Sequence, residues 1–184
     1  MKKIKILGIS GSLRKKSYNK SLLSAAKEFL PEGMEMEIFD LIDIPLYNGD
    51  VEDAGIPESV KIFKEKIASS DGLLISTPEY NYSIPGVLKN AIDWASRPPA
   101  PPLYGKPVAI MGATPGMGGT MRGQMALRHV AVNTNMIMMN KPEILVSTAQ
   151  NKFNADGKLT DEKTKEFLSK FLIEFKKWIV KLAY

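Results

Sequence analysis

Residues 72–94 read GLLISTPEYNYSIPGVLKNAIDW. The first five residues are almost wholly apolar, which predicts a strand buried on both faces of a sheet. Residues 77–84 are polar and carry two tyrosines, as expected of a loop. Pro85 suits the first turn of a helix to about Ser96, with apolar residues following at helical spacing. The stretch therefore predicts one strand–helix unit with a polar loop between them.

The same alternation extends outward from this unit in both directions. Apolar patterns predict strands at 3–9, 34–39, 72–76 and 108–111, with a fifth at either 136–139 or 144–147. Helices are predicted at 19–30, 57–70, 85–96 and 120–133, followed by a last amphipathic helix N-capped by Thr160. Residues 41–56 are expected to be irregular. Right-handed crossovers then give an α/β fold, a doubly wound parallel sheet with helices on both faces.

The composition limits the chemistry that the chain can perform. The 184 residues have the size of one domain, so residues 1–184 are predicted to form a single unit. There is no cysteine and a single histidine, His129, which excludes thiol nucleophiles, disulfides and thiolate metal sites. No metal site is expected. Either the protein only binds a ligand, or a cofactor supplies its reactive group.

The net charge of +5 is concentrated near the N-terminus. Residues 1–20 hold seven basic side chains and no acidic one. This uneven distribution of charge favours a local anion site over a general nucleic-acid surface. Alternatively, Lys2, Lys3 and Lys5 form a solvated basic tail. No apolar run approaches the roughly 18 residues of a membrane span. A cytoplasmic protein without membrane or nucleic-acid partners is expected.

The loop after the first predicted strand has the groups that bind a terminal phosphate. In doubly wound sheets, ligands bind at the carboxyl ends of the strands, which places residues 10–18, 77–84 and 112–119 at the site. The first of these loops leads into a helix N-terminus, where free N–H groups favour an anion. The phosphate-binding candidates are hydroxyls, an amide and one guanidinium: Ser10, Ser12, Arg14, Ser17 and Asn19. A solvated turn in which Ser17 or Asn19 caps the helix is the alternative.

The other two loops suit the remainder of a flat ligand. A rigid, partly prolyl turn with tyrosines and amides can hold a heterocycle through Pro78, Glu79, Tyr80, Asn81, Tyr82 and Ser83. The tyrosines could instead only pack the loop onto the sheet. The glycine-rich loop permits close approach of the backbone at Thr114, Gly116 and Gly118.

Several prominent side chains have simpler explanations than catalysis. Trp94 ends an apolar helix, which indicates a core or subunit-interface residue. Met117, Met121 and Met125 recur every four residues, as in adaptable core packing or a subunit contact. His129 continues this spacing and is interpreted as a packing or surface residue.

Two segments, GSLRKKSYN at 11–19 and PEYNYSIPGVLKNAIDW at 78–94, resemble the signature segments of the NADPH-dependent FMN reductase family. These are flavodoxin-like reductases that include quinone, chromate and azo-dye reductases. The resemblance covers nearly the whole chain. It implies a three-layer sandwich with a five-stranded parallel sheet of order 2-1-3-4-5. It also implies that Ser12, Arg14, Ser17 and Asn19 bind the FMN phosphate and that residues 78–83 lie against the isoalloxazine ring.

The resemblance implies an enzyme that moves electrons from NADPH or NADH through FMN to a quinone, azo, chromate or flavin acceptor. The flavin then supplies the chemistry, and no catalytic side chain is expected. A homo-oligomer, dimer or tetramer, is implied, with Ala91, Ile92, Trp94 and the methionines as candidate contacts. A flavodoxin-type electron carrier is the main alternative, although such carriers are typically acidic. A phosphate-ligand or nucleic-acid binding module is a third, weaker alternative.

Overall fold

The structure is a computed structural model in which residues 3–183 are described. The described residues form one parallel sheet from β1 (Ile4–Ser10), β2 (Met34–Phe39), β3 (Gly72–Ser76), β4 (Pro107–Ala113), β5 (Ile137–Met138) and β6 (Ile144–Val146). The strand order is β2-β1-β3-β4-β5, with β6 also paired to β4. The predicted α/β fold and order 2-1-3-4-5 are therefore confirmed.

The fifth position of the sheet is shared by two short strands. Both segments that the sequence offered as the fifth strand are extended: β5 pairs with the beginning of β4, and β6 pairs with its end. Pro142, which lies between them, has no N–H to donate to a ladder. As a result, β6 brings Ile144–Val146 beside the carboxyl end of β4, where a ligand is expected.

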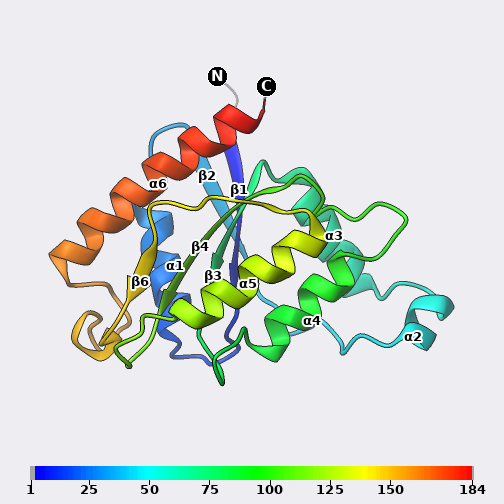
Figure 1. Ribbon diagram of the computed structural model, residues 1–184, viewed down its shortest axis with the longest axis horizontal. Coiled ribbons are helices and arrows are strands. Elements are labelled where there is room, and N and C mark those ends of the chain that lie inside the picture. The colour runs from blue at the N-terminus through cyan, green and yellow to red at the C-terminus, as the bar shows by residue number, and fades with distance from the viewer. Residues whose placement is uncertain (1–2, 184) are drawn as a thin grey trace.

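Helices cover both faces of this sheet, as Figure 1 shows. The helices are α1 (Tyr18–Glu28), α2 (Gly49–Ala54), α3 (Glu58–Ser69), α4 (Gly86–Ala95), α5 (Met121–Thr134) and α6 (Glu162–Leu182), with a short 3₁₀ turn at Ala149–Asn151. The apolar sides of α1 and α6 share one core, which includes Leu22 and Phe171. Those of α3, α4 and α5 share the other, which includes Phe63 and Leu127. The apolar side chains of the central strands β1, β3 and β4 are thus buried on both faces, which explains their near-continuous apolar runs, whereas the edge strand β2 alternates buried and exposed residues.

The start of the last helix differs from the prediction by one residue. Asp161, not Thr160, is the N-cap of α6, and its carboxylate accepts the N–H of Thr164 at 2.9 Å and the Thr164 hydroxyl at 2.5 Å. Both residue types cap helices well, so composition alone does not decide between neighbours. These two hydrogen bonds hold the pKa of the Asp161 carboxyl below its usual range.

Trp94 is completely buried within the protein. Its indole Nε1 donates to the carbonyl of Pro45 at 2.9 Å, and its ring meets the Tyr47 ring edge-on. Ala91 and Ile92 are buried as well. The prediction that these three helical residues contact another subunit is therefore wrong, because the protein's own chain already covers them.

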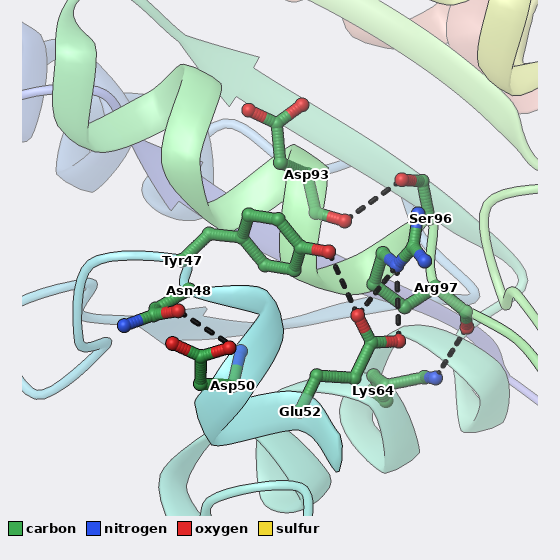
Figure 2. Close-up of polar contacts among 8 residues, drawn as sticks. All are labelled: Tyr47, Asn48, Asp50, Glu52, Lys64, Asp93, Ser96 and Arg97. Carbon is green, nitrogen blue, oxygen red and sulfur yellow. Dashed lines mark hydrogen bonds and ion pairs between the residues drawn. The ribbon is translucent and has the colours of Figure 1, made fainter.

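The segment expected to be irregular, 41–56, contains α2 and is held by a polar network (Figure 2). The Arg97 Nε donates to both Glu52 carboxylate oxygens at 2.9 and 3.0 Å, and the Tyr47 hydroxyl donates to the same carboxylate at 2.8 Å. The Lys64 Nζ donates to the Arg97 carbonyl at 2.7 Å. The Arg97 and Tyr47 hydrogen bonds keep the pKa of the Glu52 carboxyl below its usual range. The segment is thus fastened to the end of α4 through side chains that no local sequence pattern pairs.

Within residues 3–183, no helix combines the length and apolar character needed to cross a membrane.

Candidate functional site

The carboxyl ends of β1, β3 and β4 meet at a cleft of about 260 Å³. The predicted site residues that line it are Ser12, Arg14, Ser17, Asn19, Pro78, Glu79, Tyr80 and Thr114. The predicted residues outside its lining are Ser10, Asn81, Tyr82, Ser83, Gly116 and Gly118. Three further lining residues lie in the predicted loops but were not among the named candidates: Tyr18, Ala113 and Pro115. The three loops expected at the site therefore meet at the cleft, although six of the residues predicted in them do not line it.

The first loop presents hydroxyl groups and one free cation to the cleft. The Ser17 Oγ caps α1 by accepting the N–H groups of Asn19 and Lys20, as the alternative interpretation proposed. A hydroxyl that accepts in this way keeps its own hydrogen to donate to a ligand. Ser12 is buried, and Arg14 is exposed and makes no ion pair with the described residues. Hydroxyls, a guanidinium and a helix N-terminus together suit a phosphate dianion.

Asn19 is buried and joins three parts of the site. Its Nδ2 donates to the carbonyl of Ala113 at 2.9 Å, and its Oδ1 accepts the Ala113 N–H at 2.9 Å. The same oxygen accepts the Ser76 hydroxyl at 3.2 Å. The side chain thus ties the beginning of α1 to the ends of β3 and β4, and one amide hydrogen remains for a ligand. Ser10 is also used internally, since its Oγ accepts the N–H of Ser12 at 3.3 Å.

The second loop closes in a tight turn at residues 80–83. Tyr80 and Ser83 exchange two N–H···O bonds of 3.0 Å, and the residues between them, Asn81 and Tyr82, have φ of +50° and +64°. Left-handed backbone of this kind costs about 1–3 kcal/mol at a non-glycine residue, least at Asn. Among the described residues, the N–H groups of Asn81 and Tyr82 have no protein acceptor. The turn therefore offers two backbone donors close to the cleft.

Glu79 turns its carboxylate toward the beginning of α5. Its Oε2 accepts the backbone N–H groups of Arg122 and Gly123 at 2.9 and 3.0 Å. The Arg122 guanidinium lies 4.2 Å from the centre of the Tyr82 ring, and its Nη1 is 3.5 Å from the Glu79 Oε1. Arg122 was not predicted at the site, because this contact joins the loop after β3 to a helix more than forty residues further along the chain. The only local signal was a glycine-rich loop leading into a helix.

The glycine-rich stretch begins at Gly112, which lies in β4 and is tightly packed. A Cβ at Gly112 would lie 2.6 Å from the Thr77 carbonyl oxygen and would also collide with the Thr120 side chain, so only glycine fits there. Beyond it, the Thr114 N–H donates to the Val146 carbonyl and the Gly116 carbonyl accepts the Thr148 N–H, at 2.9 and 3.2 Å. These bonds tie the loop to β6 and draw Gly116 away from the cleft.

The larger hollows on the described surface, of about 390–460 Å³, are not lined by the loops after β1, β3 and β4 together. The one between β6 and α6 is about 460 Å³ and is lined in part by Leu145 and Phe167. It lies away from the carboxyl ends of β1 and β3. The smaller cleft is the one at which hydroxyls, an arginine, a helix N-terminus and a rigid turn converge.

A parallel sheet of this order, with hydroxyls and an arginine after β1 and a rigid turn after β3, defines a flavodoxin-like fold with a ligand cleft at the carboxyl ends of its strands. Residues 4–151 match the family model described as NADPH-dependent FMN reductase, and the chain belongs to that family. An NAD(P)H-dependent FMN reductase of Pseudomonas aeruginosa is 51% identical over 97% of each chain. A 2-hydroxy-1,4-benzoquinone reductase of a Burkholderia species is 41% identical over 96% of each chain.

The comparison with solved structures agrees with this family assignment. The flavoenzyme FerB of Paracoccus denitrificans, an NAD(P)H:acceptor oxidoreductase, superposes with a TM-score of 0.89 at 39% identity, covering 97% of this chain and 98% of its own. An archaeal flavodoxin shares the fold alone, with a TM-score of 0.64 at 10% identity. The predicted family, FMN as cofactor and an NAD(P)H-dependent oxidoreductase are thus confirmed. The electron-carrier alternative is less supported, because the close relatives are enzymes.

The residues present fit FMN. Its phosphate is a dianion, and the first loop offers Arg14 with the hydroxyls of Ser12 and Ser17. Its ring system is flat and mostly apolar, and the side of the cleft nearest β3 offers Pro78 and Tyr80. The ring also carries polar edges, for which the turn at 80–83 provides unpaired N–H groups.

Proposed function

We propose that this chain transfers electrons from NADH or NADPH to a quinone, with FMN bound in the cleft between the loops after β1, β3 and β4. The observation that carries the proposal is that hydroxyls and a guanidinium from the loop after β1 and the start of a rigid turn after β3 line one cleft. Bound FMN supplies the hydride and electron chemistry that the side chains of this protein lack. Relatives named quinone reductase in Escherichia coli and Pseudomonas putida support a quinone as acceptor.

The protein's own residues bind and orient. Arg14, Ser12 and Ser17 would hold the phosphate, and Pro78 and Tyr80 would line the ring. The N–H groups of Asn81 and Tyr82 would stabilise negative charge that develops on the reduced ring, an electrostatic role that needs no titrating group. Glu79 is not proposed as an acid or base, because its carboxylate is already engaged with α5.

The acceptor range is proposed to be broad. Tyr80 lines the cleft and Tyr82 lies in the adjoining turn, and both are exposed, so they offer aromatic surfaces to a planar acceptor. Quinones are proposed as the preferred acceptors. Azo dyes, chromate and free flavin belong to the same proposal as slower ones, since they too need only reach the exposed face of the ring.

A steady-state assay tests this function. FMN-loaded protein should oxidise NADH or NADPH continuously in the presence of 1,4-benzoquinone, with no partner reductase added. Parallel assays with an azo dye, chromate and free FMN rank the acceptors. An electron carrier of flavodoxin type would give no steady oxidation. Protein that does not take up FMN, judged by its visible absorbance, would contradict the proposal altogether.

The assembly and location are proposed alongside the reaction. We propose a homo-oligomer, a dimer or a tetramer, whose contact includes the exposed methionines of α5. Met121 and Met125 are about half exposed on that helix, and the preceding Met117 is 82% exposed. A cytoplasmic location is proposed because reduced nicotinamide dinucleotides are produced and used inside the cell.

A further inference from the structure

The turn at residues 80–83 has a sequence that does not match its backbone. Two central residues with positive φ between a mutually bonded pair form a hairpin turn of the primed type. Asn followed by Gly is the preferred pair for such a turn, because Asn tolerates the left-handed region and Gly has no Cβ. Asn81 meets this preference, whereas Tyr82 does not. Contacts from outside the turn are therefore needed to hold Tyr82 in place.

One such contact is made by Glu79, the residue before the turn. Its carboxylate accepts two N–H groups at the beginning of α5, where the helix dipole favours a negative charge. The α5 N-cap, Thr120, makes no side-chain capping bond, so Glu79 performs this task from another element. The Glu79 side chain is only 16% exposed. Its position fixes the entrance of the turn against α5.

The second contact is made by Arg122, which reaches both the entrance and the middle of the turn. Its guanidinium lies over the Tyr82 ring at 4.2 Å and pairs with the Glu79 carboxylate at 3.5 Å. A planar cation of this kind can stack on an aromatic face while its edge faces a carboxylate. Tyr82 is 67% exposed, so the guanidinium is a main partner of its ring.

Close backbone packing completes the arrangement. A Cβ at Gly123 would lie 3.2 Å from the Ser83 carbonyl oxygen and 3.3 Å from the Glu79 Cα. The beginning of α5 therefore lies directly against both ends of the turn. This leaves little room for the turn to adopt another backbone conformation.

We propose that Glu79 and Arg122 form a clamp that holds the 80–83 turn in the conformation that accepts the flavin ring, which makes Arg122 a positioning residue. This inference rests on the proposed function, since it assigns the turn to the ring. With the clamp in place, the N–H groups of Asn81 and Tyr82 are set before the ligand arrives. Binding then loses less conformational freedom than it would with a mobile loop.

The test compares Arg122→Met with Arg128→Met. The second variant removes the same charge from the same helix, but the Arg128 side chain contacts Met139 and Asn140 and not the turn. Amide hydrogen exchange of Tyr80 and Ser83 is measured on flavin-free protein, and dissociation constants for FMN and riboflavin are measured by fluorescence quenching. Arg122→Met should speed the exchange of both amides and weaken both flavins by about five- to tenfold. Glu79→Gln, which keeps an acceptor for α5, should act in the same direction.

Repeating the Arg122→Met substitution in a Tyr82→Gly variant shows whether its effect acts through the strained turn. Tyr82→Gly gives the turn its preferred Asn-Gly pair and relieves the backbone mismatch. In that background, Arg122→Met should change flavin affinity by less than about twofold, because there is little left for the clamp to hold.

Three results would overturn the clamp: unchanged exchange in Arg122→Met, a loss confined to FMN with riboflavin unaffected, or an undiminished loss in the Tyr82→Gly background. The second result would indicate that Arg122 acts on the phosphate. Failure of the proposed function is a different observation, namely wild-type protein that binds neither flavin. The exchange comparison, made without flavin, still tests the clamp in that case.

Discussion

At the scale of single residues, Arg14 gives the most direct test of the phosphate assignment. It is exposed, lines the cleft, and has no carboxylate partner among the described residues. Arg14→Ala should weaken FMN by about 1.5–3 kcal/mol, the contribution of a charge-assisted contact. Riboflavin, which lacks the phosphate, should bind as before.

The matched control for Arg14 is its neighbour Lys15. Lys15→Ala removes the same charge from the same loop but lies outside the cleft lining. Titration by fluorescence quenching of both variants with both flavins separates a local contact from a general electrostatic effect. Equal losses in Arg14→Ala and Lys15→Ala would argue against a specific phosphate contact.

Asn19 also stabilises the fold, a role that its position in the first loop did not predict. The sequence placed it beside a phosphate, and the structure adds three internal hydrogen bonds to Ser76 and Ala113. Asn19→Ala would leave the buried N–H and C=O of Ala113 without partners. We expect the free energy of unfolding to fall by about 2–4 kcal/mol, measured by urea denaturation of the flavin-free protein.

A control for Asn19 is Ser24→Ala on the same helix, α1, which removes a hydroxyl that makes no hydrogen bond among the described residues. It should leave the urea midpoint nearly unchanged. A loss below about 1 kcal/mol for Asn19→Ala would show that the three bonds are not maintained in solution.

At the scale of elements, the N-cap of α6 predicts a pH dependence of stability. The Thr164 hydroxyl and N–H lower the folded-state pKa of Asp161. A carboxyl with a lowered folded pKa contributes stability that is fully present above its unfolded pKa of about 3.9. The contribution is lost as the pH falls through the lower folded pKa. Stability from this cap should therefore decline only below about pH 4.

Asp161→Asn isolates this contribution, because Asn caps a helix about as well but does not titrate. The difference in urea midpoint between wild type and Asp161→Asn should be constant from pH 5 to 7. It should shift in favour of the variant as the pH is lowered toward 2. A difference that does not vary with pH would mean that Asp161 is not the group that caps α6.

The elements also show where sequence reasoning succeeds and where it stops. Strands buried on both faces and helices with one apolar stripe have periodic patterns, so β1, β3 and α6 could be predicted from local sequence. The segment at 41–56 has no such pattern. Its short helix α2 is held by Arg97, which lies 45 residues after Glu52 in the chain and whose carbonyl accepts a hydrogen bond from Lys64. The Glu79–Arg122 contact was missed for the same reason.

At the scale of the whole molecule, the basic charge concerns ligand binding and the exposed apolar surface concerns assembly. The basic N-terminal loop contributes Arg14 to the cleft, and the anion site that the uneven charge indicates is part of the proposed function. The methionine stripe was interpreted as either core packing or a subunit contact. Its exposure on α5 excludes core packing, so the subunit contact remains as the proposal.

Exposed apolar side chains of α5 form the surface on which the proposed oligomer can be tested. Met121 is 49% exposed, Met125 52% and Val132 80%. Flexible thioether side chains suit contact surfaces, and a charge buried at such a contact without a partner is costly. Met125→Glu should therefore convert a dimer or tetramer into a smaller species, measured by analytical ultracentrifugation. Phe167→Glu, which places a charge at a similarly exposed apolar position on α6, should leave the mass unchanged. A monomeric wild-type protein would contradict the assembly, and an effect of Phe167→Glu alone would move the contact to the opposite face of the sheet.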